Sequence, residues 1–376
     1  MNITTERNQE IWHDMQEPGS YEWWYFDAED KESDLSFVII WFAGFPFSPY
    51  YMNHYEDWKN RVVTCAPVPS DYSGFSFQLY ENDRETLNFI REGRNGLFES
   101  NSSNIGARFE KNRFSYDEQR NEYILDIDFS FPARFKEVKV SLLFKGLQRL
   151  VYEKKDQNDA GSGYRHQWVL SVPRADVEGE IEIYDQQKKK VRTIPVKASG
   201  YHDHNSGFVP MQDHITRWHW GRAFSGRFNL VYYLIFFKNA VSKPLTLIIL
   251  QDNTTGENTF LDRAVLTESN FRRGLFSPLH SRKLELRHEN ICLKIDHRRV
   301  LDAGPFYLRF TSSMVLEMHG NRHEPMEGIS EYLDPTRLNS RFMRFFTQSR
   351  IWRDGEESLM YDTYNNIKRT LDWKNR

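Results

Sequence analysis

Apolar and polar residues alternate with a period of two along much of this chain, and this pattern constrains the fold more than any other feature. Phe75, Phe77 and Leu79, for example, alternate with Ser76 and Gln78. A strand of this kind buries one face against a core and exposes the other, as antiparallel sheets do. The same alternation recurs at residues 125–130, 138–142, 180–183, 284–287 and 291–296.

Two further runs, Phe228–Phe237 and Leu245–Leu250, are apolar on both faces. They are expected to be central strands, or strands with one face on the core and one on a ligand cavity. Helical periodicity is clear only near the C-terminus, where four residues share one face: Met360, Tyr364, Ile367 and Leu371. We predict an all-β protein with one or two barrels or sandwiches and a C-terminal helix.

Length and composition narrow the function classes. At 376 residues two domains are expected, with a boundary between residues 165 and 200. The 50 basic and 53 acidic residues give a net charge of −3, so no nucleic acid is expected as a partner. No secretory signal is visible, and no stretch reaches the about 18 apolar residues that span a bilayer. We predict a cytoplasmic protein without stable membrane insertion. The arginine- and phenylalanine-rich segment at 336–352 is expected to be a solvated face beside a docked aromatic face, and a helix on a membrane surface or against a partner is the alternative.

The densest group of polar and aromatic side chains lies at 198–207 and 217–222, and it is the predicted working site. Polar groups at this density need water or each other as partners. If the first segment is extended, His202 and His204 point to one face, and Tyr201, Asp203 and Asn205 to the other.

Three interpretations of this group stay open at this point. His202 and His204, with His214 or His219, have a spacing that can hold a metal, although no supporting ligand motif accompanies them. Alternatively, Asp203 acts as an acid whose pKa desolvation raises, with aromatic rings that stabilise a carbocation. The third interpretation is a closed hydrogen-bond network with a structural role.

Weaker candidates lie elsewhere. Glu22 precedes Trp23 and Trp24 and can place a carboxylate at a pocket mouth, whereas a capping aromatic cluster is the structural alternative. His54 lies in an aromatic-rich segment suited to a lid or to a plain surface loop. The chain has no nucleophile elbow, phosphate-binding loop or dinucleotide fingerprint, so hydrolase, kinase and nicotinamide-dependent functions are poorly supported.

Several motifs, in order over nearly the whole chain, give it a family resemblance. They are Tyr21–Tyr25, Trp168 with Pro173–Ala175, Gly200–Asn205, Trp218–Arg222 and Gly328–Leu333. With them the chain resembles the carotenoid 1,2-hydratase family, which also takes in the AttH-like proteins and the lipocalin-like Diels–Alderases. The resemblance implies two tandem lipocalin-like antiparallel β-barrels, here residues 1–185 and residues 186–376 with the C-terminal helix. It also implies a long, apolar, polyunsaturated substrate bound between or inside the barrels, and no metal or organic cofactor.

The chain departs from the family pattern at two places. Ser206 stands where the family often has a tryptophan after His-Asp-His-Asn. The resemblance to the hydratases also implies a working carboxylate on the strand after Trp-x-Trp-Gly-Arg. In this chain that strand begins with Asn229–Tyr233, which contains no acid. Cyclisation or isomerisation of another polyene or isoprenoid therefore fits as well as hydration of a carotenoid.

We predict a cofactor-free lyase or isomerase that starts hydration or cyclisation of an isoprenoid or polyene by proton transfer. Asp203 is the expected acid; Tyr201, His202, His204 and His219 are the other expected catalytic residues, and the histidines set its protonation. The expected substrate-binding residues are Glu22, Trp23, Trp24, His54, Asn205, Trp218, Trp220, Arg222 and Tyr233. The alternatives are a Diels–Alderase-type pericyclase and a non-catalytic carrier of a hydrophobic ligand. The sequence leaves the oligomeric state open.

Overall fold

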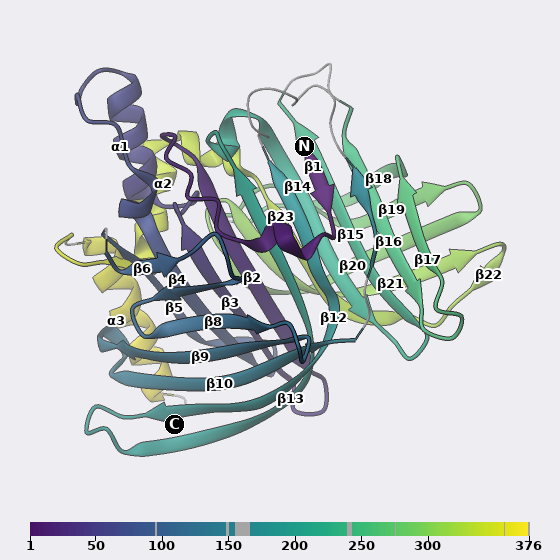
Figure 1. Ribbon diagram of the computed structural model, residues 1–376, viewed down its shortest axis with the longest axis horizontal. Coiled ribbons are helices and arrows are strands. Elements are labelled where there is room, and N and C mark those ends of the chain that lie inside the picture. Colours follow the sequence, from purple (N-terminus) through teal and green to yellow (C-terminus); the bar gives the residue numbers. More distant parts are fainter. Residues whose placement is uncertain are drawn as a thin grey trace. The chain divides into compact units, whose positions relative to one another are not determined.

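The structure is a computed structural model that describes residues 1–94, 96–147, 150–154, 166–238, 243–274, 276–356 and 358–374. Strands dominate it, and they form two curled sheets (Figure 1). The described residues contain three α-helices: α1 (Pro49–Lys59), α2 (Arg341–Thr347) and α3 (Leu359–Lys374). The predicted all-β class and the predicted C-terminal helix are confirmed. Within the described ranges no helix has the length and apolar character needed to cross a bilayer.

The first sheet has the strand order β24-β5-β4-β3-β2-β13-β12-β10-β9-β8-β7-β6, with β1 and β11 beside β12. Among the pairs whose register the described residues define, β1 with β12 and β24 with β5 are parallel and the others are antiparallel. The strand bounds are β1 Asn2–Thr4, β2 Tyr21–Asp30, β3 Leu35–Ala43, β4 Ser73–Glu81, β5 Arg84–Gly93, β6 Phe98–Ser100, β7 Gly106–Phe109, β8 Asn112–Asp117, β9 Glu122–Phe131, β10 Lys136–Gly146, β11 Glu153–Lys154, β12 Gln167–Tyr184, β13 Lys190–Gly207 and β24 Ile351–Arg353.

The second sheet has the order β17-β16-β15-β14-β23-β21-β20-β19-β18, with β22 beside β21. All its pairs are antiparallel within the described residues. The strand bounds are β14 Ile215–Phe224, β15 Phe228–Phe237, β16 Leu245–Asp252, β17 Asn258–Asp262, β18 Val265–Arg272, β19 His280–His288, β20 Ile291–Ala303, β21 Tyr307–Met318, β22 Asn321–Arg322 and β23 Met326–Leu333.

The alternating sequence pattern explains why each sheet has its own core. In β9, Leu125, Ile127 and Phe129 are buried while the residues between them are only partly buried, as a one-sided strand requires. Curling turns these buried faces inward around an aromatic core in the first sheet and a mainly aliphatic core in the second. The runs that are apolar on both faces became β15 and β16, which are buried along almost their whole length.

Two compact units divide the chain. The first comprises residues 1–82, 86–210 and 344–376, and the second comprises residues 83–85 and 211–343. The boundary expected at residue 185 falls in the turn between β12 and β13, two long strands that pair with each other inside the first unit. The helix α3 also belongs to the first unit. A division into separately folding domains at residue 185 stays a prediction.

Candidate functional site

The predicted polar block forms the end of β13, between β12 and β2. It is extended as expected, so its side chains alternate between the two faces of the first sheet. His202 lies opposite Phe26 and stacks on its ring at a centroid distance of 3.8 Å. His204 lies opposite Trp24 and stacks on its indole at 4.9 Å. Both histidines therefore point into the aromatic core of the first unit.

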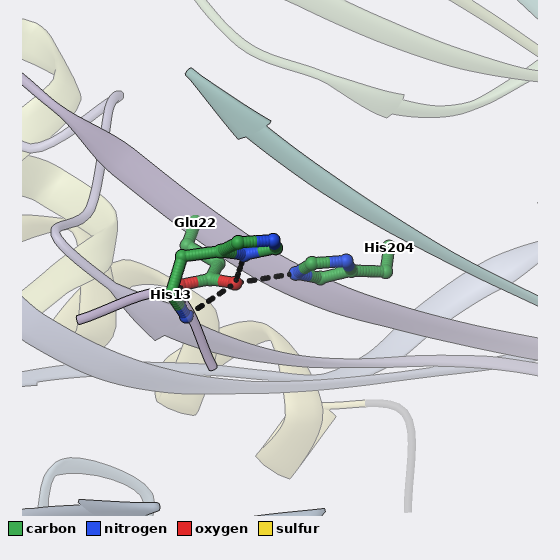
Figure 2. Close-up of side chains that lie close together, drawn as sticks. All are labelled: His13, Glu22 and His204. Atoms are coloured by element: carbon green, nitrogen blue, oxygen red, sulfur yellow. Dashed lines mark hydrogen bonds and ion pairs between the residues drawn. The ribbon is translucent and has the colours of Figure 1, made fainter. Parts of the chain in front are cut away.

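Glu22 of β2 joins two histidines at this inner face (Figure 2). Its carboxylate lies 2.8 Å from Nε2 of His204 and 2.6 Å from Nδ1 of His13, and it accepts a hydrogen bond of 3.1 Å from the backbone N–H of His13. Glu22 and His204 are fully buried. Burial raises the pKa of Glu22, but the hydrogen bonds from His13 and His204 outweigh it and leave the pKa below its ordinary value.

The protonation of this cluster follows from the geometry. An ionised carboxylate only accepts hydrogen bonds, so Nε2 of His204 carries the proton that it donates to Glu22. Burial, partly opposed by Glu22, lowers the pKa of His204, so its ring is neutral. Nδ1 of His204 then bears a lone pair, and it is buried without a hydrogen-bond partner among the described residues.

The same three side chains have the composition of a metal site. One ligand atom from each of His13, Glu22 and His204 lies within 4.8 Å of the others. A histidine bound to a metal through one nitrogen normally donates a hydrogen bond from the other, and Nδ1 of His204 has no acceptor among the described residues. The contacts with Glu22 also have ordinary hydrogen-bond lengths. The geometry favours a hydrogen-bonded network over a metal centre.

A second buried carboxylate lies on the same inner face. Glu10, at the end of a short 3-10 helix, accepts hydrogen bonds from Tyr123 at 2.9 and 2.8 Å and lies 3.0 Å from Nε2 of His202. Nδ1 of His202 contacts the backbone carbonyl of Tyr25 at 2.9 Å, so Nδ1 must carry a proton. Glu10 thus links Tyr123 and His202 inside the core.

Asp203 faces the opposite side of the sheet. It accepts hydrogen bonds from Trp168 Nε1 at 2.8 Å, from Tyr201 Oη at 2.7 Å and from Asn205 Nδ2 at 3.0 Å. It retains 5% exposure, whereas Glu10 and Glu22 retain none. Asp203 is therefore held in one orientation at a face with residual access to solvent.

Aromatic side chains surround Asp203 on this face. Trp23 lies opposite Asn205 in the strand register and stacks on Tyr21 at 5.5 Å. Tyr25 lies opposite Asp203 and meets Tyr201 edge to face at 6.2 Å. By contrast, Trp24 belongs to the inner face, so the predicted set of Glu22, Trp23 and Trp24 is divided between the two faces. This division follows from the strand period of two.

The histidines predicted to set the protonation of Asp203 have other carboxylates as partners. His202 and His204 contact Glu10 and Glu22 on the opposite face. His54 lies on α1, where its ring nitrogens contact Tyr72 Oη at 2.7 Å and the carbonyl of Cys65 at 3.0 Å. Any effect of the histidines on Asp203, and any substrate contact of His54, stays a prediction.

The remaining predicted residues lie on β14 and β15 of the second unit. Trp218 meets Tyr233 edge to face at 6.4 Å, and the Arg222 guanidinium lies 4.8 Å from the Phe224 ring centroid. Trp220 and Arg222 share the face of Trp218 by alternation. His219 points the other way, and its Nε2 lies 3.4 Å from Glu268, which also accepts hydrogen bonds from Arg217 and Ser281.

Sequence reasoning missed several residues of these networks. Glu10 and His13 lie in an N-terminal segment without a strand pattern, and Tyr123 and Glu268 look like ordinary strand residues. A family motif marked one further hydrogen-bonded carboxylate: Glu331, within the motif at 328–333, accepts hydrogen bonds from Arg309 and Tyr307. A buried carboxylate and an exposed one look alike when only local sequence is read.

Two curled sheets of this kind place the chain among the lipocalin-like β proteins. The family model described as the carotenoid hydratase CrtC matches residues 39–359. This chain belongs to the carotenoid hydratase family.

Individual relatives agree with this assignment. A protein of Chlorobaculum tepidum named hydroxyneurosporene dehydrogenase is 49% identical over 372 residues, which are 99% of this chain and 97% of the relative. An acyclic carotenoid 1,2-hydratase of Rubrivivax gelatinosus is 26% identical over 207 residues, 55% of this chain and 45% of the relative. The crystal structure of CghA with Sch210972 superposes with a TM-score of 0.59 at 11% identity, over 89% of this chain and 98% of CghA. That likeness concerns the fold alone.

Proposed function

We propose that this chain adds water across a carbon–carbon double bond of an acyclic carotenoid, with Asp203 as the proton donor. Family membership supports the substrate class and the reaction. The observation that carries the residue assignment is the position of Asp203: a carboxyl group that is 5% exposed and is fixed by three hydrogen bonds on the aromatic face of β13, opposite the fully buried Glu10 and Glu22.

The reaction balances with this one carboxyl group. Protonated Asp203 transfers its proton to one alkene carbon, and the electron pair of the double bond forms the new C–H bond. The other carbon becomes a carbocation. A water molecule attacks that carbon and loses a proton to the Asp203 carboxylate, which restores the acid. The net change is the addition of one water.

The neighbours of Asp203 suit both of its protonation states. When Asp203 is ionised, Trp168, Tyr201 and Asn205 donate to it. When it is protonated, the hydroxyl group of Tyr201 can rotate and accept, because a phenol is both donor and acceptor. Aromatic rings such as Trp23 and Tyr25 stabilise a nearby cation by about 0.5–2 kcal/mol each.

Glu10 and Glu22 are less suited to meet a substrate. Both are fully buried, and each contacts a histidine of the inner face. The side chains of the aromatic core fill this inner face, so its role is to hold β13 and β2 in register. We therefore assign Glu10, Glu22, His202 and His204 to positioning of the strand that carries Asp203.

The test is turnover of an acyclic carotenoid by the purified protein and by Asp203→Asn. The amide cannot supply the proton, so we expect turnover to fall at least about a hundredfold. Asp176→Asn on β12 is the matched control, because Asp176 is exposed, and it should keep the wild-type rate. Full turnover by Asp203→Asn would overturn the assignment of the acid.

Product mass distinguishes the candidate reactions. Hydration adds the mass of one water. The name of the Chlorobaculum tepidum relative favours a second candidate, dehydrogenation, which removes two hydrogens and needs an electron acceptor. Cyclisation or isomerisation leaves the mass unchanged but alters the absorption spectrum of the polyene, and a carrier returns its ligand unaltered.

A further inference from the structure

The tip of the β18–β19 hairpin combines exposed apolar and basic side chains. Phe271, Phe276 and Leu279 lie within nine residues of one another and are 48%, 43% and 46% exposed. Single exposed apolar residues are ordinary on protein surfaces, whereas a cluster of large ones marks a site of interaction. The adjacent Arg272 and Arg273 are also exposed.

A second segment lies beside this tip. Nη2 of Arg337, in the 3-10 helix Pro335–Asn339, donates a hydrogen bond of 2.9 Å to the backbone carbonyl of Phe276. The same nitrogen lies 3.5 Å from Sδ of Met343. Arg337 thus joins the hairpin tip to the start of α2, where Arg341 is exposed and Phe342 is 58% exposed. All these residues belong to the second unit.

The charge of this surface is strongly positive. Neither residues 269–282 nor residues 335–344 contain an aspartate or a glutamate. Next to the tip, Lys283 pairs with Ser269 across the two strands, and both line an open groove of about 460 Å³. The groove has four basic residues (Lys283, Lys294, Arg298 and Arg322) against two acidic ones (Glu285 and Asp296). Because Lys294 also pairs with Glu317 at 2.8 Å, the groove adds only a small excess of positive charge to that of the tip.

We propose that this surface docks the protein on a lipid bilayer that contains anionic headgroups. We call it the tip patch: Phe271, Arg272, Arg273, Phe276, Leu279, Arg341 and Phe342. Its aromatic and aliphatic side chains enter the boundary between headgroups and acyl chains, and its arginines contact lipid phosphates. The proposal depends on exposure and charge, and it holds whichever reaction the protein catalyses.

A membrane suits the tip patch better than a protein partner does. A stable protein interface buries about 800 Å² on each side, which is more than the seven residues of the tip patch supply. A bilayer needs only a few inserted side chains with cations around them. An apolar polyene dissolves in the hydrocarbon interior of a bilayer. Docking on the bilayer therefore also brings the protein to the substrate class of the proposed function.

The experiment is co-sedimentation of the full chain with vesicles. One set contains equal parts of phosphatidylcholine and phosphatidylglycerol, and the other contains phosphatidylcholine alone. We expect binding to the mixed vesicles that weakens with salt, and weakening of at least about tenfold in the double variant R272E/R273E. The double variant F276S/L279S should weaken similarly, because it removes the inserted side chains.

Matched controls change the same chemistry elsewhere. K188E/K189E reverses two exposed charges in the turn between β12 and β13, and F135S removes a phenylalanine that is also 43% exposed. Both should bind vesicles as the wild type does. Absence of wild-type binding, equal binding to both vesicle sets, or unchanged binding by the tip variants would overturn the proposal. The proposal would also be overturned if sedimentation velocity showed a wild-type dimer that the tip variants dissociate.

Turnover of carotenoid dissolved in detergent separates this proposal from the proposed function. The tip variants should turn over detergent-dissolved substrate at the wild-type rate, which also shows that they are folded. If neither the wild type nor the tip variants turn over carotenoid, but vesicle binding changes as described, the proposed reaction is wrong and the docking surface is still supported.

Discussion

At the scale of single residues, the first unit shows how buried charge is tolerated. An ionised carboxylate inside a core is costly unless hydrogen-bond donors replace the lost water. Glu22 receives donors from the backbone and ring of His13 and from the ring of His204. Glu10 receives them from Tyr123 and lies 3.0 Å from Nε2 of His202. Each carboxylate thereby links the N-terminal segment to β13.

Removing one of these carboxylates should destabilise the fold. Glu22→Ala leaves the ring N–H of His204 buried without an acceptor, so we expect the free energy of unfolding to fall by about 3 kcal/mol. Glu22→Gln should lose less, because the amide oxygen still accepts. Urea denaturation measures both variants, with exposed Glu118→Ala as the control. A loss for Glu22→Ala no larger than that of Glu118→Ala would contradict the stabilising role of the cluster.

At the scale of elements, the strands that carry the site approach each other closely at Gly200. A Cβ atom built there would lie 2.5 Å from Cγ2 of Val177 and 2.8 Å from Cε1 of Phe144. β13 can therefore lie against the residues of β10 and β12 only because position 200 has no side chain. Glycine in the polar block thus has a packing role.

An added methyl group at this position should overpack the core. We expect Gly200→Ala to lower the free energy of unfolding by about 1–3 kcal/mol, because neither Val177 nor Phe144 can withdraw without moving other core side chains. Gly226→Ala is the matched control: no atom lies within 4 Å of its Cβ position, so stability should stay unchanged or rise slightly. Equal melting temperatures for the two variants would rule out this explanation.

At the scale of the whole molecule, burial keeps several histidines neutral. Burial lowers the pKa of His204 in the first unit and of His219, His280 and His297 in the second, and for His297 the shift is large. Between the lowered pKa of each folded-state histidine and about pH 6.5, the unfolded chain binds a proton that the folded chain does not. Stability must therefore fall as the pH falls through that value, by about 1.4 kcal/mol per pH unit for each histidine involved.

The contribution of one histidine can be isolated. Between pH 5 and about 6.5, the unfolding free energy should depend less steeply on pH in His297→Asn. The slope should fall by about 1.4 kcal/mol per pH unit, which is the contribution of one proton. His319→Asn, which changes an exposed histidine, is the matched control. Glu268 does not interfere: the nearby His219 ring, with Arg217 and Ser281, outweighs burial and holds the pKa of Glu268 at about 2, so its stabilisation is lost only below about pH 4.3. A slope that stays the same in both variants would contradict the prediction.

Local pattern alone was enough for much of this molecule. The period of two predicted one-sided strands such as β9, and the apolar runs predicted the buried strands β15 and β16. The same period placed His202 and His204 on one face of β13 and Asp203 on the other. The motifs at 21–25 and 200–205 indicated the family. All these inferences use residues within a few positions of one another, where backbone geometry alone fixes which way side chains point.

Only the tertiary structure decided which groups meet. Glu10 is paired with His202 across 192 positions of sequence and Glu22 with His204 across 182. His219 and Glu268 come from strands at different places in the second sheet. Partners of this kind are set by long-range strand pairing and by the path of the N-terminal segment, which no local periodicity encodes. The sequence thus determined the strands and their two faces, and the pairing of those strands decided which carboxylate each histidine holds.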